Sequence, residues 1–184
     1  IVLRAAQDIG EALMVVHAGG LIHSDIKPDN LFSTHDGRTV IIDFGLARGS
    51  AGDELTGFTG YTPGYAPPEQ QQGQLLSYSV DIFSLGATLY HLFTGDKPLD
   101  VTKRLEGQPL PALSSLRPDL PESVCTTIQS CLELAVERRP ATVVAVLAGL
   151  GLGGSGKLHL PSVPALSPQA EVAAHRGGVY CLTL

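Results

Sequence analysis

The sequence predicts an α+β fold that is mainly helical and carries one small β-hairpin. Residues 1–18 place apolar side chains at the i, i+3, i+4, i+7 spacing of an amphipathic helix, which two glycines then end. Residues 77–94 are apolar on every helical face, a pattern typical of a buried central helix. Two short β-favouring runs, 31–32 and 39–42, flank His35-Asp36-Gly37, and this arrangement indicates a hairpin.

The remaining segments connect or extend these elements. Residues 21–30 have no clean period and contain a proline, so we expect a loop there. Residues 45–65 are rich in glycine and also lack a period, and loops of this length inside a compact domain are usually functional. A further helix is predicted over 124–134, and a last one runs from Pro140, as its first residue, to about Leu150.

The chain is expected to hold one domain over residues 1–150, followed by a linker over 151–170 that is rich in Gly, Pro and Ser. Residues 171–184 then begin a different segment. The first residue is not Met and lies inside a predicted helix, so we expect these 184 residues to be a fragment.

Composition excludes several classes of protein. The net charge of −6 argues against a nucleic-acid partner, which normally meets a basic face. The three cysteines are too few and too irregularly spaced for a disulfide framework or a zinc site, so they are predicted to be buried thiols in a reducing compartment. The longest apolar stretch, 143–152, is far shorter than the ~20 residues that a bilayer requires. We therefore expect a cytoplasmic location, with no signal peptide and no membrane segment in this chain.

Two polar motifs carry the chemistry. His23-Ser24-Asp25-Ile26-Lys27-Pro28-Asp29-Asn30 places an acid, a base and an amide on one loop, and Asp43-Phe44-Gly45 follows the predicted hairpin. The hairpin can bring Asn30 and Asp43 together, and their oxygen atoms suit Mg²⁺, which usually takes one or two protein ligands plus phosphates. Asp25 would face the same space and would be free to accept a hydroxyl proton.

These motifs, and three later ones in the same order, resemble the C-terminal lobe of a eukaryotic-type Ser/Thr protein kinase, with a bacterial character. Residues 23–30 look like the catalytic loop and residues 43–45 match the metal-binding motif. Residues 62–69 look like the end of the activation segment, with Pro-Pro-Glu where the family reads Ala-Pro-Glu. Residues 81–86 resemble the start of the central helix, and residues 139–140 resemble a late Arg-Pro step. The implied fold is a kinase-like C-lobe, with the hairpin as its catalytic β-structure and the N-lobe absent.

The resemblance implies phosphoryl transfer from ATP to a protein Ser or Thr hydroxyl. Asp25 would orient and deprotonate the hydroxyl, and Lys27 would neutralise charge on the transferred group. Asn30 and Asp43 would hold Mg²⁺, and Leu31 would lie under the adenine ring.

The resemblance also assigns packing and structural roles. His23 and Phe44 would stack in the regulatory spine, and Asp81 would accept backbone hydrogen bonds beneath the catalytic loop. Glu69 and Arg139 would form a buried ion pair between the activation segment and the final helices.

Two further positions indicate the branch of the kinase family and the way in which its activity is controlled. Thr62, in the substrate-facing loop, would hydrogen-bond both the lysine and the catalytic aspartate, as in Ser/Thr kinases. Ser24 stands where most of the family has Arg, so a phosphate on Thr56 or Thr59 would lose its usual partner, for which Arg48 is a weaker substitute. We therefore expect activity to depend little on phosphorylation of the activation loop.

Alternatives remain. A small-molecule phosphotransferase of the aminoglycoside-kinase kind shares the loop and the metal Asp but lacks an activation segment. The other alternative is a pseudokinase scaffold, because residues 174–182 are similar to the opening of a WD-repeat propeller blade, a possible platform for protein partners. The chain has no G-x-G-x-x-G loop ahead of a strand and no strand lysine, so we expect the fragment alone to be inactive.

Overall fold

The computed structural model describes residues 1–45, 47–49 and 60–153. In chain order the elements are α1 (Val2–Ala18), β1 (Leu21–Ile22), the 3₁₀ helix η1 (Pro28–Asn30), β2 (Leu31–Ser33), β3 (Thr39–Ile41), β4 (Arg48–Gly49), α2 (Pro68–Gln71), α3 (Ser79–Thr94), α4 (Val101–Leu105), α5 (Leu113–Leu116), α6 (Glu122–Cys131), the 3₁₀ helix η2 (Val136–Arg138) and α7 (Val143–Gly149).

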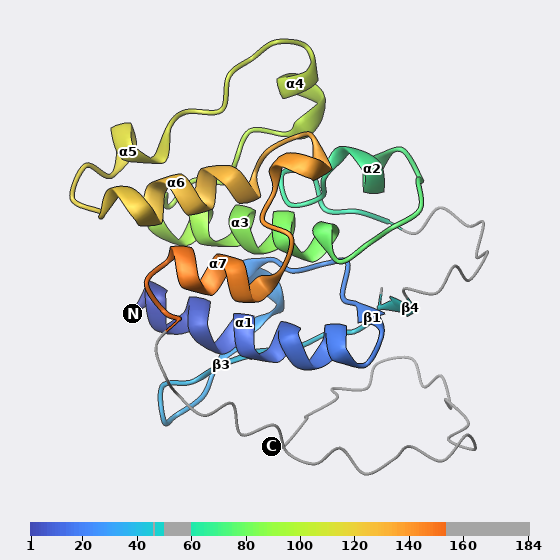
Figure 1. Cartoon of the computed structure of the whole chain (residues 1–184), viewed down its shortest axis with the longest axis vertical. Helices are drawn as coiled ribbons and strands as arrows, with labels where there is room; N and C mark the ends of the chain where they lie inside the picture. Colours follow the sequence, from blue (N-terminus) through green and yellow to red (C-terminus); the bar gives the residue numbers. More distant parts are fainter. Residues whose placement is uncertain (46, 50–59, 154–184) are drawn as a thin grey trace.

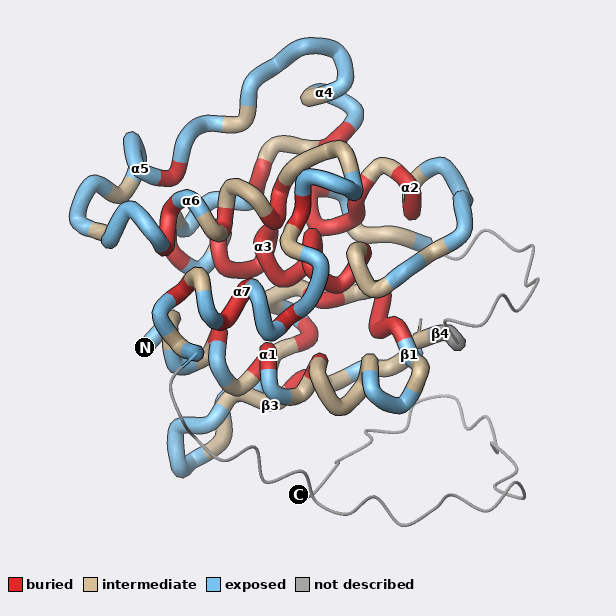
Figure 2. Tube along the Cα trace, in the orientation of Figure 1, coloured by how far each residue is buried: buried red, intermediate tan, exposed pale blue. Residues whose placement is uncertain are grey.

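Helix α3 is the centre of the domain, as its all-round apolar pattern predicts. Figure 2 shows it buried along most of its length. Gly95 ends the helix in the left-handed conformation, at φ 81°, and its amide donates to the His91 carbonyl.

The other long helices surround α3. Helices α1 and α6 both pack against it, and α7 contacts α1 and α6 (Figure 1). Helix α6 approaches α3 closely at Gly86, where an added Cβ would collide with the Cβ of Cys131. The absence of a side chain at Gly86 therefore sets the distance between these two helices.

The predicted hairpin is present and lies against α1. Strands β2 and β3 pair antiparallel, with Leu31 opposite Ile41 and Ser33 opposite Thr39. The Asp8 carboxylate of α1 accepts a hydrogen bond from the Thr39 amide at 2.8 Å. Helix α1 thus positions the hairpin, and the hairpin positions the chain that follows it.

Two segments predicted to be loops contain a small second sheet. Strand β1, within 21–30, pairs antiparallel with β4, within 45–65. Each strand has two residues, too few to show a period of two, and the pairing joins positions far apart in sequence. Helices α2, α4 and α5 were not predicted either, because a turn or so of helix is too short for an amphipathic pattern.

Two helix boundaries differ from prediction. Helix α7 begins at Val143 and not at Pro140, because the Thr142 side chain caps it by accepting a hydrogen bond from the Ala145 amide. Helix α6 ends at Cys131, before the predicted 134. The carbonyls of Glu133 and Leu134 instead accept hydrogen bonds from the Arg139 guanidinium.

Within the described residues, no helix is both long and apolar enough to cross a membrane. Cys125 and Cys131 are buried and free, and burial raises the pKa of Cys131 to about 12. Cys181, most of the predicted linker and the segment similar to a propeller blade lie outside the described residues.

The close approach of α3 and α6 generates a prediction. Gly86→Ala is expected to lower the free energy of unfolding by about 1–3 kcal/mol through overpacking, although alanine favours helix by about 1 kcal/mol. Gly10→Ala is the matched control, since its Cβ would meet the flexible end of Leu147 and is expected to cost less. Urea unfolding measures both changes, and equal stability of the two variants would contradict the proposed packing constraint.

Candidate active site

The site begins with a buried carboxylate in the central helix. Asp81 has no exposed surface. Its two oxygens accept hydrogen bonds from the backbone amides of His23, at 2.9 Å, and Ser24, at 2.8 Å. His17, at the end of α1, lies 2.8 Å from the same carboxylate and stacks on the Tyr78 ring. Asp81 therefore anchors the start of the 23–30 loop to the domain core.

Two more buried polar side chains share the face of α3 that carries Asp81. Asp81, Ser84 and Thr88 follow the i, i+3, i+7 spacing, and all three are almost fully buried. Ser84 donates to the carbonyl of Tyr65 at 2.9 Å, and Thr88 donates to the carbonyl of Ile26 at 3.3 Å. This polar stripe holds both the 23–30 loop and the segment that contains Thr62.

Asp25, Lys27 and Thr62 form a closed triangle of hydrogen bonds. Lys27 Nζ lies 2.7 Å from Asp25 Oδ2 and donates to Thr62 Oγ1 at 2.9 Å. Thr62 Oγ1 in turn donates to Asp25 Oδ1 at 2.8 Å. Asn30 Nδ2 adds bonds to the Asp25 carboxylate at 3.0 Å and to its carbonyl at 2.8 Å. The Asp25 side chain is 11% exposed, so it is oriented by its neighbours and still reachable from solvent.

Asn30 and Asp43 lie at the same end of the hairpin. The amide of Ile42, next to Asp43, donates to the Asn30 carbonyl at 2.9 Å. The two side chains differ in their partners, because Asn30 turns its NH₂ group to Asp25, whereas Asp43 Oδ1 accepts from the Gly45 amide at 3.0 Å. These bonds use neither the side-chain oxygen of Asn30 nor Asp43 Oδ2. An amide oxygen and an exposed carboxylate fit the donor set of Mg²⁺.

Two residues of the site hold left-handed backbone conformations without being glycine. Ser24 has φ 68° and Asp43 has φ 65°. Such conformations cost roughly 1–3 kcal/mol each and persist only where surrounding contacts impose them. At Ser24 the imposing contacts are visible, since its amide donates to Asp81 and its carbonyl accepts from Gln70 Nε2 at 2.8 Å.

His23 and Phe44 pack against each other, and Leu31 begins the first strand of the hairpin. The His23 and Phe44 rings meet edge to face, with centroids 4.6 Å apart. Burial lowers the pKa of His23, and the negative charges of Asp81, Asp25 and Asp43 offset this only in part, so the imidazole is neutral at neutral pH. Leu31 is partly buried and packs against the main core.

Glu69 and Arg139 form a buried bidentate ion pair. Arg139 Nη1 donates to Glu69 Oε1 at 2.6 Å and Nη2 donates to Oε2 at 3.0 Å. The guanidinium also donates to the carbonyls of Glu133, Leu134 and Ser79, and its centre lies 5.0 Å from the centroid of the Phe83 ring. The pair fastens α2 to the chain that precedes α7.

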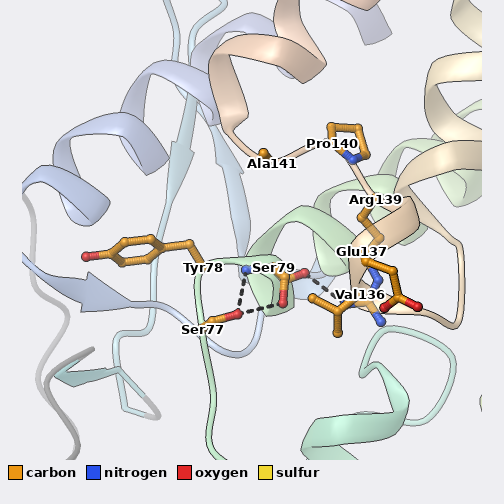
Figure 3. Close-up of a pocket in the computed structure, with 8 residues that line it drawn as sticks. All are labelled: Ser77, Tyr78, Ser79, Val136, Glu137, Arg139, Pro140 and Ala141. Atoms are coloured by element: carbon orange, nitrogen blue, oxygen red, sulfur yellow. Dashed lines mark hydrogen bonds between the residues drawn. The ribbon is translucent and has the colours of Figure 1, made fainter.

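A cavity of about 310 Å³ adjoins this ion pair and not the Asp25 cluster. It lies between the N-terminal end of α3 and the stretch from η2 to Ala141, and the Tyr78 ring points away from Val136, Glu137 and Arg139 (Figure 3).

Several residues that organise the site were not predicted from the sequence, namely His17, Gln70, Ser84 and Thr88. Ser84 and Thr88 carried a usable signal, because they are polar at helical spacing from Asp81 within an otherwise apolar helix. His17 and Gln70 carried none, because their partners lie far away in sequence.

The ion pair gives a stability prediction. Glu69→Leu and Arg139→Met are each expected to lower the free energy of unfolding by about 3–5 kcal/mol, because each leaves one buried charge unpaired. The double variant is expected to cost clearly less than the sum of the two, which a double-mutant cycle in urea measures. Strict additivity would show that the two side chains act independently.

Comparison with known proteins assigns the chain to a family. Residues 2–148 match the protein kinase domain family. The chain is 36% identical over 151 residues to the serine/threonine-protein kinase PknA of Mycobacterium tuberculosis, covering 76% of this chain and 33% of that protein. It is 31% identical over 143 residues to the serine/threonine-protein kinase drp72 of Corynebacterium efficiens, covering 77% of this chain and 27% of that protein.

A third relative aligns over more of the chain. The serine/threonine-protein kinase AfsK of Streptomyces coelicolor is 34% identical over 182 residues, covering 94% of this chain and 22% of that protein. The chain thus spans about a quarter to a third of the first two relatives. With a family match over most of its length, and bacterial Ser/Thr kinases among its relatives, this chain belongs to the protein kinase domain family.

Proposed function

We propose that the protein carrying this chain is an ATP-dependent Ser/Thr protein kinase, and that residues 1–150 form the C-terminal lobe of its catalytic domain. The observation that carries the proposal is the closed triangle of Asp25, Lys27 and Thr62. It joins a carboxylate, an ammonium and a hydroxyl from two segments held on the same helix. The kinase names of the relatives agree with this function.

Asp25 is proposed as the base. A carboxylate offers about four acceptor positions, and Asp25 uses three of them for Lys27, Asn30 and Thr62. The remaining position can accept the proton of a substrate hydroxyl. The hydroxyl oxygen then bonds to the γ-phosphorus of ATP, the bond from that phosphorus to the β,γ-bridging oxygen breaks, and ADP leaves.

Lys27 and the two oxygen donors would handle charge. Lys27 Nζ, which is paired with Asp25, would neutralise charge on the transferred phosphoryl group. Asn30 and Asp43 would hold Mg²⁺, which supplies charge neutralisation at the phosphates. Leu31 would pack beneath the adenine ring.

The 184 residues alone are proposed to transfer no phosphate. A glycine-rich loop over the phosphates and a strand lysine normally precede the catalytic loop. Gly151, Gly153 and Gly156 have the G-x-G-x-x-G spacing, but they follow α7 in the chain and so stand in the wrong order.

Two substitutions test the division of roles. In the full-length protein, Asp25→Asn is expected to reduce kcat by at least 10³-fold while the Kd for Mg·ATP stays within about twofold, because Asp25 faces the hydroxyl. Asp43→Ala is expected to weaken Mg·ATP binding about tenfold or more, because a metal ligand is lost. Phosphate transfer to a generic protein acceptor and calorimetric titration with Mg·ATP measure the two effects. Equal loss of nucleotide affinity in both variants would show that the roles are wrongly divided.

A second test concerns regulation. Ser24 is uncharged and 3% exposed, so it offers no guanidinium to a phosphate on Thr56 or Thr59, which both lie outside the described residues. The double variant Thr56→Ala/Thr59→Ala is expected to keep the wild-type kcat within about threefold. A tenfold drop, about 1.4 kcal/mol in the barrier, would show that a loop phosphate controls this enzyme after all.

A further inference from the structure

Gln70 is a buried amide whose side chain bonds to the catalytic loop. It is 8% exposed, and its Nε2 donates to the carbonyl of Ser24 at 2.8 Å. Its Oε1 has no hydrogen-bond partner within the described residues. Burying an amide with an unpaired oxygen costs stability. The hydrogen bond to the Ser24 carbonyl is therefore what distinguishes glutamine at this position. An apolar side chain of the same length could not make it.

The carbonyl that Gln70 holds belongs to a strained residue. Ser24 has φ 68°, and its amide donates a hydrogen bond to Asp81. Residue 24 immediately precedes Asp25, so the orientation of its peptide determines where the Asp25 side chain starts. Two buried side chains, one from α3 and one from α2, thus clamp the peptide groups that flank Ser24.

The clamp from α2 is itself anchored. Gln70 follows Glu69, which is fixed by the bidentate pair with Arg139. Adjacent residues of α2 therefore bind the C-terminal part of the domain and the catalytic loop. The Gln70–Ser24 link is made of uncharged groups, so it requires no phosphate.

We propose that Gln70 is a positioning residue, which holds the Ser24 carbonyl and so keeps the Asp25 carboxylate in its catalytic orientation. The consequence for transfer rests on the proposed kinase function, whereas the consequence for the catalytic loop does not. The link couples α2 to the 23–30 loop, so the two segments are expected to open together. It performs, with neutral groups, the coupling of activation segment to catalytic loop that an arginine and a phosphate would otherwise provide.

The primary test measures loop order without using activity. In the full-length protein, Gln70→Met removes the donor and keeps the side-chain length, and Gln72→Met makes the same change at an exposed position of the same segment. Hydrogen exchange of the His23 and Ser24 amides, which donate to Asp81, is expected to accelerate about tenfold in Gln70→Met, equivalent to about 1.4 kcal/mol. Exchange in α6 and α7 is expected to stay at the wild-type rate, as is exchange everywhere in the Gln72→Met control.

The second readout separates positioning from general damage. Gln70→Met is expected to lower kcat at least tenfold while the KM for ATP stays within about twofold, and Gln72→Met is expected to match the wild type. If the wild-type protein transfers no phosphate, the proposed function fails, and the exchange experiment still decides the role of Gln70.

Unchanged exchange at His23 and Ser24 in Gln70→Met, or equal acceleration throughout the domain, would overturn the proposal. If Gln70→Met does not fold, native-state exchange of the wild type in mild denaturant replaces it. The His23 and Ser24 amides are then expected to open together with the α2 amides, at the same denaturant dependence. Opening of α2 while those two amides stay protected would overturn the proposal equally.

Discussion

The buried carboxylate of Asp81 is the constraint on which the rest of the site depends. A charge with no exposed surface is tolerated only when its hydrogen bonds are made. Asp81 makes them with the backbone amides of His23 and Ser24 and with the ring of His17. The 23–30 loop is therefore held by the core of the domain, and the buried carboxylate requires that loop in return.

The same helix explains how distant segments meet. Helix α3 is buried on nearly all sides, so any polar group on it must find a partner inside the protein. Ser84 finds the Tyr65 carbonyl and Thr88 finds the Ile26 carbonyl. The 23–30 loop and the segment around Thr62 are consequently fixed to one rigid element, which brings Thr62 to Asp25 at hydrogen-bond distance.

Helix α2 is held by two chemically different contacts. Glu69 pairs with Arg139, and Gln70 binds the carbonyl of Ser24. Ser24 is nearly fully buried between α2 and α3, a setting in which a charged side chain would lose its hydration. A small uncharged residue therefore suits position 24, and the neutral amide of Gln70 donates a hydrogen bond to its carbonyl.

Much of this protein was predictable from local pattern. The period of residues 1–18, the all-round apolar character of 77–94 and the hairpin signal at 35–37 depend on neighbours in the chain, and the structure confirms the corresponding elements. The motifs at 23–30 and 43–45 indicated the protein kinase family, which the family match confirms. The roles of Asp25, Lys27, Asn30 and Asp43 remain proposals.

Tertiary structure alone decided the rest. The pairing of β1 with β4, the bond from Gln70 to Ser24 and the contact of His17 with Asp81 each join residues more than 20 positions apart. The start of α7 and the end of α6 likewise followed from particular hydrogen bonds, to Thr142 and to Arg139. Periodicity reports which face of an element is buried, but it carries no information on which distant polar atom will satisfy a buried donor or acceptor. That choice is made only when the elements pack and buried polar groups are brought to particular partners.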